Sequence, residues 1–325
     1  MEATIAMPRQ FDGVTLSQFL CFVERSSHSR YDGDIFRRYV IRGNLMSGCF
    51  TKALVTNICR VLGLTILTLA PAALFAQDRS PHSAFEEIRR FSAEEAFQGV
   101  AVDGNHFYAI SNRRIGKYEK HSGLRVGQWE GDPDGPIIHL DSGIVREGRL
   151  YCAHSNFPGV PMVSSIEVFD TETMDHVGSH SFGIFAGSAT WVDWADGYWW
   201  VAFGHYTGLG GVPDRGPAWT NVVQFDDGWR RLAGYVYPRD IVDRFETMSN
   251  SGGSWGADGK LYATGHDEAE VFVLSLPAAG SVLELRETLP VTAEGQGIAW
   301  DRDEPGTFYS IIRSSREVVV SKLQQ

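Results

Sequence analysis

QGVAVDGNHFYAISNR, residues 98–113, contains the unit that repeats along this chain. A small residue leads a short apolar run, an Asp-Gly turn follows, and an aromatic run then ends in polar side chains. Asp-Gly between two β-rich runs is a strong signal for a β-hairpin. The stretch therefore predicts two antiparallel strands, with polar groups where the second strand ends.

Four further copies of this unit follow, and they begin at Ser142, Ser188, Gly252 and Gln296. The small residues that lead the five first strands are Gly99, Gly143, Ala189, Gly253 and Gly297, with intervals of 44, 46, 64 and 44 residues. A period of about 40 to 50 residues with several short strands is typical of a β-propeller blade. A Gly- and Pro-rich insertion at residues 204–219 accounts for the longer third interval.

Each unit also contains material for a third and a fourth strand, most clearly in residues 164–182, 220–237 and 270–289. The fifth unit supplies only three strands, and we expect residues 84–93 to add the missing outer strand. Such closure protects sheet edges. The sequence therefore predicts an all-β protein, a β-propeller of five four-stranded blades. Six blades is the alternative, and a β-sandwich would not need five similar units.

The first 76 residues differ from the rest of the chain. Residues 61–76, VLGLTILTLAPAALFA, form an uncharged run that follows the basic residues Lys52 and Arg60. A run of this length fits a signal peptide better than a spanning helix, which needs roughly 20 residues. We expect residues 1–45 to be an over-extended gene start, residues 46–76 a signal peptide and residues 77–325 one propeller domain. The mature protein would be periplasmic or secreted, without a stable membrane anchor; an uncut anchor is the alternative.

The chain has 40 acidic and 29 basic side chains and a formal net charge of −11. This acidic excess repels phosphate backbones and argues against nucleic acid as a partner. Cys152 is the one cysteine that follows the predicted leader, so a disulfide within the mature chain is not expected. We interpret Cys152 as a small buried apolar residue. The expected partner is a small molecule, and the sequence leaves the oligomeric state open.

Polar residues recur at the lead positions and at the ends of the second strands, which should meet at one face of the ring. We predict His154, His205 and His266 as catalytic groups, because imidazole exchanges protons near neutral pH. They lie 3, 5 and 4 residues beyond Tyr151, Trp200 and Tyr262, so their register is imperfect. The predicted substrate-binding residues are Gln98, Asn112, Arg113, His139, Asn156, Tyr206, Asn250, Asp267, Gln296 and Arg313.

Arg113 and Arg313 favour a carboxylate ligand, since guanidinium can bind it through two hydrogen bonds. No phosphate-binding loop, GxSxG elbow or HExxH motif is present in the sequence, and we predict no cofactor. A zinc site from the three histidines is an alternative, as is bound calcium. Asp141, Asp193 and Glu94 are interpreted as turn or edge residues.

Residues 98–118, 135–145, 150–170, 249–256 and 296–306 resemble a family of bacterial secreted propeller proteins often labelled cycloisomerase, after muconate-lactonising propeller enzymes. The resemblance covers nearly all of residues 86–323. It implies cofactor-free intramolecular addition or lactone chemistry on a carboxylated substrate, with an arginine holding the carboxylate and a histidine moving the proton. The lactonising enzymes have seven blades and this chain has five units, so no catalytic residue transfers by position.

We therefore expect an enzyme of the isomerase or intramolecular-lyase type. A metal-dependent lactonase-type hydrolase and a non-catalytic propeller that binds a ligand or a protein are the alternatives, because one fold hosts many functions.

Overall fold

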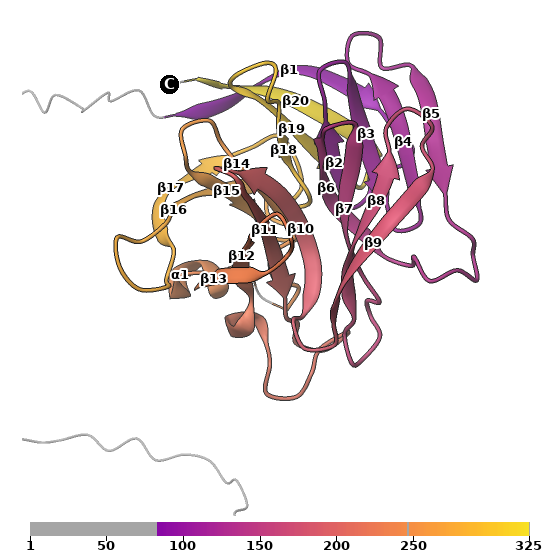
Figure 1. Ribbon diagram of the computed structural model, residues 1–325. Helices are drawn as coiled ribbons and strands as arrows, with labels where there is room; N and C mark the ends of the chain where they lie inside the picture. Colours follow the sequence, from indigo (N-terminus) through magenta and orange to yellow (C-terminus); the bar gives the residue numbers. More distant parts are fainter. Residues whose placement is uncertain (1–82, 246, 325) are drawn as a thin grey trace, which may run out of the picture. The chain divides into compact units, whose positions relative to one another are not determined.

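The computed structural model describes residues 83–245 and 247–324. The described residues form five four-stranded antiparallel sheets, and Figure 1 shows these sheets as blades around a ring. The predicted five-bladed β-propeller is confirmed, and the six-bladed alternative is wrong. The predicted gene start and signal peptide, residues 1–45 and 46–76, lie outside the described residues and stay predictions.

Each blade runs from an inner strand to an outer strand. Blade one consists of β2 (Gly99–Val102), β3 (His106–Ser111), β4 (Arg114–Glu119) and β5 (Arg125–Glu130). Blade two consists of β6 (Leu140–Arg146), β7 (Arg149–Ser155), β8 (Ser164–Asp170) and β9 (His176–Gly183). Blade three consists of β10 (Ser188–Ala195), β11 (Tyr198–Gly204), β12 (Asn221–Phe225) and β13 (Arg231–Val236).

Blade four consists of β14 (Gly252–Trp255), β15 (Leu261–Thr264), β16 (Glu270–Ser275) and β17 (Glu284–Pro290). Blade five consists of β18 (Ala299–Trp300), β19 (Thr307–Ile312), β20 (Glu317–Gln324) and β1 (Ala84–Ser92). Two short helices, η1 (Pro217–Trp219) and α1 (Arg239–Val242), lie in the connections on either side of β12 and β13. Within residues 83–245 and 247–324, no helix has the length and apolar character needed to cross a membrane.

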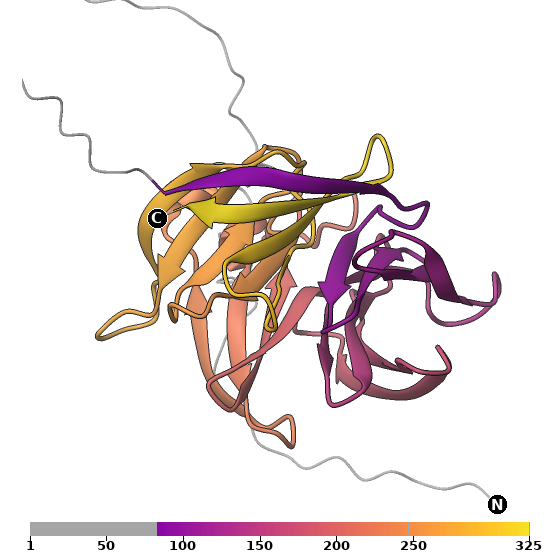
Figure 2. The ribbon, with the colours of Figure 1, turned by 90° about the horizontal axis from the view of Figure 1, so that it is seen from above.

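The two ends of the described chain close the ring together. β1 pairs antiparallel with β20, from Ala84 opposite Gln324 to Ser92 opposite Glu317, and Figure 2 shows the two strands side by side. The prediction that residues 84–93 complete the last blade is confirmed. A buried ion pair between Lys120 of blade one and Asp301 of blade five, with 2.5 Å between Nζ and Oδ2, also crosses this closing interface.

Small residues lead the inner strands because these strands touch at the axis. A Cβ atom added to Gly297 would lie 2.7 Å from the Cα atom of Gly99, closer than real Cβ contacts come. The hairpin turns are determined by the residues within them. Asp196 and Gly197, between β10 and β11, have φ values of 53° and 82°, as the tight turn that suits a twisted hairpin requires.

Five clusters of buried apolar side chains make up the core of the described residues, and each joins two neighbouring blades. Trp191 and Trp255, for example, belong to the cluster between blades three and four. Trp300 packs between blades four and five. Cys152 is fully buried and free, as expected. Burial of these faces stabilises the ring by roughly 25 cal/mol per Å² of apolar surface.

Candidate functional site

Two β-bulges turn polar side chains toward the mouth of the axis. The register of β6 against β7 shifts between Leu140 and Gly143, and that of β10 against β11 shifts between Ala189 and Trp191. A bulge places an extra residue in one strand and redirects its side chain. Asp141 lies in the first bulge and Thr190 in the second.

Both bulge residues line a cavity of about 60 Å³ at the axis, which we call the axial pocket. The pocket brings together five of the predicted site residues, which are Gln98, His139, Tyr206, His266 and Arg313. Its other lining residues are Asp141, Phe157, Thr190, Met248 and Ser251. Five of the predicted residues, each from a different blade, therefore line one cavity, and their roles stay predictions.

Asp141 and His139 have opposite electrostatic behaviour in this pocket. The carboxyl group of Asp141 is 5% exposed, and its hydrogen bond within the described residues comes from the neighbouring Ser142 N–H at 3.2 Å. Burial raises the pKa of Asp141 well above its ordinary value. Burial, together with the charges of His154 and Arg313, lowers the pKa of His139 to about 4. The pocket thus favours a protonated acid beside a neutral imidazole.

Arg313, His266 and Asp267 form a chain along the other wall. Arg313 Nη1 donates to His266 Nε2 at 3.2 Å, and His266 Nδ1 donates to Asp267 Oδ1 at 2.6 Å. The guanidinium carbon of Arg313 also lies 3.8 Å from the ring centroid of Phe97. Burial lowers the pKa of Arg313. Asp267 therefore orients the imidazole, while stacking fixes the guanidinium at the pocket.

Three buried polar atoms near the axis have no hydrogen-bond partner within the described part of the chain. They are Ser142 Oγ, Thr190 Oγ1 and Gln296 Oε1. Buried polar atoms are nearly always satisfied by protein, water or a ligand. Of these three residues, Thr190 lines the axial pocket, so its hydroxyl group is placed to bind a polar ligand atom there.

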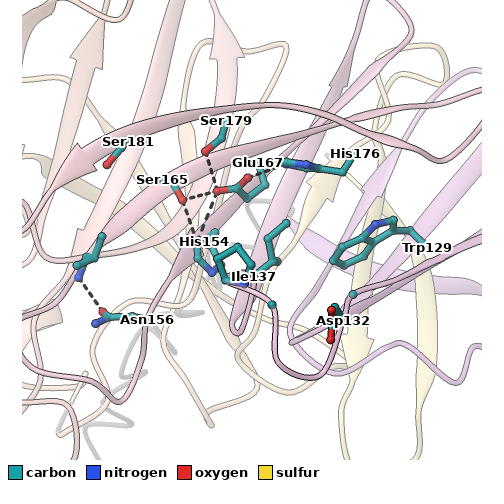
Figure 3. Close-up of a pocket in the computed structure, with 14 residues that line it drawn as sticks. Trp129, Asp132, Ile137, His154, Asn156, Ser165, Glu167, His176, Ser179 and Ser181 are labelled. Atoms are coloured by element: carbon teal, nitrogen blue, oxygen red, sulfur yellow. Dashed lines mark hydrogen bonds and ion pairs between the residues drawn. The ribbon is translucent and has the colours of Figure 1, made fainter.

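A second cavity, of about 600 Å³, lies between blades one and two and is shown in Figure 3. We call it the lateral pocket. His154 Nδ1 lies 2.8 Å from Ser165 Oγ, and Ser165 donates to Glu167 Oε1 at 2.6 Å. His176 Nε2 and Ser179 Oγ donate to the same carboxylate at 2.7 and 2.9 Å. Trp129 forms part of the opposite wall.

The three predicted catalytic histidines do not share one cavity. His266 lines the axial pocket, His154 lines the lateral pocket, and His205 lies beside Arg215 in separate cavities next to blade three. His154 lies within β7, whereas His205 and His266 follow the ends of β11 and β15, so the three rings are set by different local backbones. The three histidines of the zinc alternative are separated for the same reason, and no group of three metal-ligating side chains occurs among the described residues.

Several other predicted binding residues make their hydrogen bonds inside the protein. The Asn250 amide accepts from Trp191 and Tyr237 and donates to two backbone carbonyls, which uses its full capacity. Asn112 accepts from Gln98 at 2.6 Å, and Gln296 donates to the His266 carbonyl at 2.6 Å. These side chains support the mouth of the axis.

The side chains of Asn156 and Arg113 form hydrogen bonds with the backbone of two loops. The Asn156 amide bonds to Pro161 O and Val163 N at 3.1 and 2.7 Å, across the loop after β7. Arg113 donates to the carbonyl oxygens of Asp132 and Ile137, both at 3.3 Å. The Arg113 guanidinium thus contacts the loop between β5 and β6, whereas Arg313 reaches the axial pocket.

Sequence reasoning missed Asp141, Glu167 and His176. Asp141 directly precedes the lead residue Ser142, and that position was the available signal. Glu167 shares a strand face with Ser165, two residues earlier, inside an otherwise apolar strand. A carboxylate in such a position indicates a buried polar network.

Comparison with known proteins identifies no family. No family model matches the chain, and no curated protein matches it. The PQQ-bound aldose sugar dehydrogenase of Streptomyces coelicolor is 9% identical and covers 74% of this chain and 98% of its own, with a TM-score of 0.49. A luciferin-regenerating enzyme is 12% identical and covers 70% of this chain and 76% of its own, with a TM-score of 0.42.

The hydrazine synthase of Kuenenia stuttgartiensis is also 12% identical and covers 69% of this chain and 82% of its own, with a TM-score of 0.42. Similarities at these identities concern the fold and carry no functional argument. None of the comparisons supports the resemblance to cycloisomerase-labelled proteins, which stays a hypothesis.

Proposed function

We propose that the axial pocket binds the carboxylate end of a small molecule and catalyses proton transfer on it, without a cofactor. The observation that carries the proposal is the buried Asp141 carboxyl, with its raised pKa, in one small cavity with Arg313 and His266. Strongly perturbed pKa values in a cleft are characteristic of acid–base sites. A cavity of about 60 Å³ accommodates a carboxylate group, and the rest of the ligand would extend from the mouth.

The residues divide into an anion site and a proton-transfer pair. Arg313 would exchange its hydrogen bond with His266 for one with the ligand carboxylate. Asp141 would act as the acid. His139, 4.0 Å from the Asp141 carboxylate, would return the proton from solvent.

The reaction that fits best is intramolecular addition of a carboxylate to a carbon–carbon double bond, the chemistry implied by the cycloisomerase resemblance. The carboxylate oxygen forms the C–O bond, the π electrons move to the far carbon, and Asp141 protonates that carbon. Solvent then reprotonates Asp141. The reverse step removes the same proton, so no oxidant or second substrate is required.

The test uses cis,cis-muconate and related unsaturated carboxylates, with loss of diene absorbance as the readout. Asp141→Asn keeps the shape of the side chain and removes its proton, so we expect turnover to fall by about 10²- to 10⁴-fold. Asp134→Asn, at an exposed loop position, is the control that should keep wild-type rates. Equal turnover by Asp141→Asn and wild type would refute the catalytic proposal. Carboxylate binding without turnover would favour the binding-module alternative.

We also propose that the protein is exported and works in the periplasm or outside the cell. The proposal depends on residues 46–76 of the sequence. Mass spectrometry of the expressed protein should find Gln77 as the first residue. A mature protein that retains residues 61–76 would contradict cleavage.

A further inference from the structure

The lateral pocket differs in charge from the axial pocket. Its fourteen lining residues include two carboxylates, Glu167 and Asp132, and no lysine or arginine. Two imidazoles, His154 and His176, also face it. Its volume of about 600 Å³ lies in the usual range for small-molecule sites.

Glu167 is a buried carboxylate without a lysine or arginine partner among the described residues. It is 5% exposed, and its hydrogen bonds come from Ser165, Ser179 and His176. Burying a carboxylate is costly unless a positive charge compensates it. The hydroxyl groups of Ser165 and Ser179 donate hydrogen bonds to the Glu167 carboxylate, but they carry no positive charge to compensate it.

The hydrogen bonds of His154 favour its neutral form. The Ile138 N–H donates to His154 Nε2 at 3.1 Å, so the ring proton lies on Nδ1 and points to Ser165 Oγ. Burial also lowers the pKa of His154. His154 therefore relays a hydrogen bond to Glu167 through Ser165 and does not neutralise it. His176 contacts Glu167 directly from the outer strand β9.

The wall opposite Glu167 is apolar and aromatic. Trp129 is half-buried, packs edge-on against Phe169 at 4.8 Å between ring centroids, and lines the pocket together with Ile137 of the loop after β5. Figure 3 shows Trp129 and Glu167 among the side chains that line the cavity, with His176 near both. An indole ring attracts a desolvated cation. Arg113, the nearby guanidinium, is bonded to the loop carbonyls of Asp132 and Ile137 and is absent from the lining.

We propose that the lateral pocket is a binding site for an organic ammonium ion with a compact apolar body. The ammonium group would lie between Glu167 and Trp129, and the apolar part would contact Ile137 and Val163. The site lies between blades one and two, apart from the axial pocket, and does not depend on the proposed reaction.

The test compares charged probes with neutral molecules of the same shape, by isothermal titration at pH 8. Choline is paired with 3,3-dimethylbutan-1-ol, and benzylammonium with benzyl alcohol. We expect each cation to bind at least tenfold more tightly than its neutral partner, about 1.4 kcal/mol. Glu167→Gln should abolish this difference. Glu172→Gln, an exposed charge change in the same blade, should retain it.

Trp129→Leu provides a second route if Glu167→Gln does not fold, because it removes the aromatic face and leaves the buried network in place. It should weaken cation binding by several-fold and affect the alcohols less. The proposal is overturned if the alcohols bind as tightly as the cations, or if neither cation binds at about 10 mM. It is equally overturned if both variants bind the cations like wild type.

Discussion

The axial and lateral pockets lie on two sides of one loop, residues 131–139, and are built in opposite ways. Ile137 of this loop lines the lateral pocket and His139 lines the axial pocket. The axial pocket combines a guanidinium with a buried acid in about 60 Å³, whereas the lateral pocket sets a buried carboxylate against an indole in about 600 Å³. One short loop thus supplies lining residues to two pockets whose charged side chains differ.

The largest expected effect comes from removing a buried side chain that supports two lining residues of the lateral pocket, Trp129 and His176. Phe169 is fully buried in β8 and contacts both Trp129 and His176, with ring centroids 4.8 and 5.2 Å away. Phe169→Ala should lower the free energy of unfolding by about 3–5 kcal/mol. It should also abolish cation binding, because Trp129 loses its support. Urea unfolding and titration with choline measure the two effects.

Phe272→Ala is the matched control for this variant. Phe272 is equally buried, in blade four, and its loss should cost a similar free energy of unfolding without changing the lateral pocket. If Phe169→Ala retained choline affinity while folded, the position of Trp129 would not depend on its contact with Phe169, and the contrast between the pockets would need another basis.

The second prediction concerns pH and tests the axial side of the comparison. The pKa of His139 falls to about 4 in the folded protein, below its ordinary value of 6.5. The unfolded chain therefore binds more protons than the folded protein between these two pH values. For this reason His139 lowers the free energy of unfolding as the pH falls from 6.5 toward 4. Between pH 7.5 and pH 4.5, His139 should lower the free energy of unfolding of the wild type by about 2–3 kcal/mol, and His139→Gln should not show this decrease.

Asp141 acts in the opposite sense, since its raised pKa lets the folded protein hold a proton that the unfolded chain releases. Its contribution is complete below the ordinary pKa of an aspartate and is lost as the pH rises through the folded value. Asp141→Asn should therefore make the protein more stable than wild type at alkaline pH, by more than about 1 kcal/mol.

Unfolding free energies measured at pH 4.5, 7.5 and 9 separate the contributions of His139 and Asp141. Parallel pH curves for wild type and His139→Gln would contradict the burial of His139.

The ring was predictable from the sequence because each unit specifies its own hairpins, as at Asp196-Gly197, and because the period fixes the number of blades. The site was less predictable. Asp141 and Thr190 reach the axis through bulges in β6 and β10, and a bulge changes which face a residue occupies without changing the sequence pattern. Asn250 shows the opposite problem. Its amide was predicted to bind substrate, but its oxygen accepts hydrogen bonds from the buried residues Trp191 and Tyr237, which are distant in the sequence.

The smallest expected effect comes from Arg113→Gln, which changes the contacts of the loop that lines both pockets. Arg113 holds the carbonyl oxygens of Asp132 and Ile137 at 3.3 Å, and these contacts fix the loop on both sides. Arg113→Gln should cost about 1 kcal/mol of unfolding free energy and weaken ligand binding in both pockets by up to about fivefold. Arg149→Gln, which changes an exposed ion pair with Asp170 at the far end of blade two, is the control. An effect confined to one pocket would show that the loop is not their common wall, and that each pocket is held by its own strands.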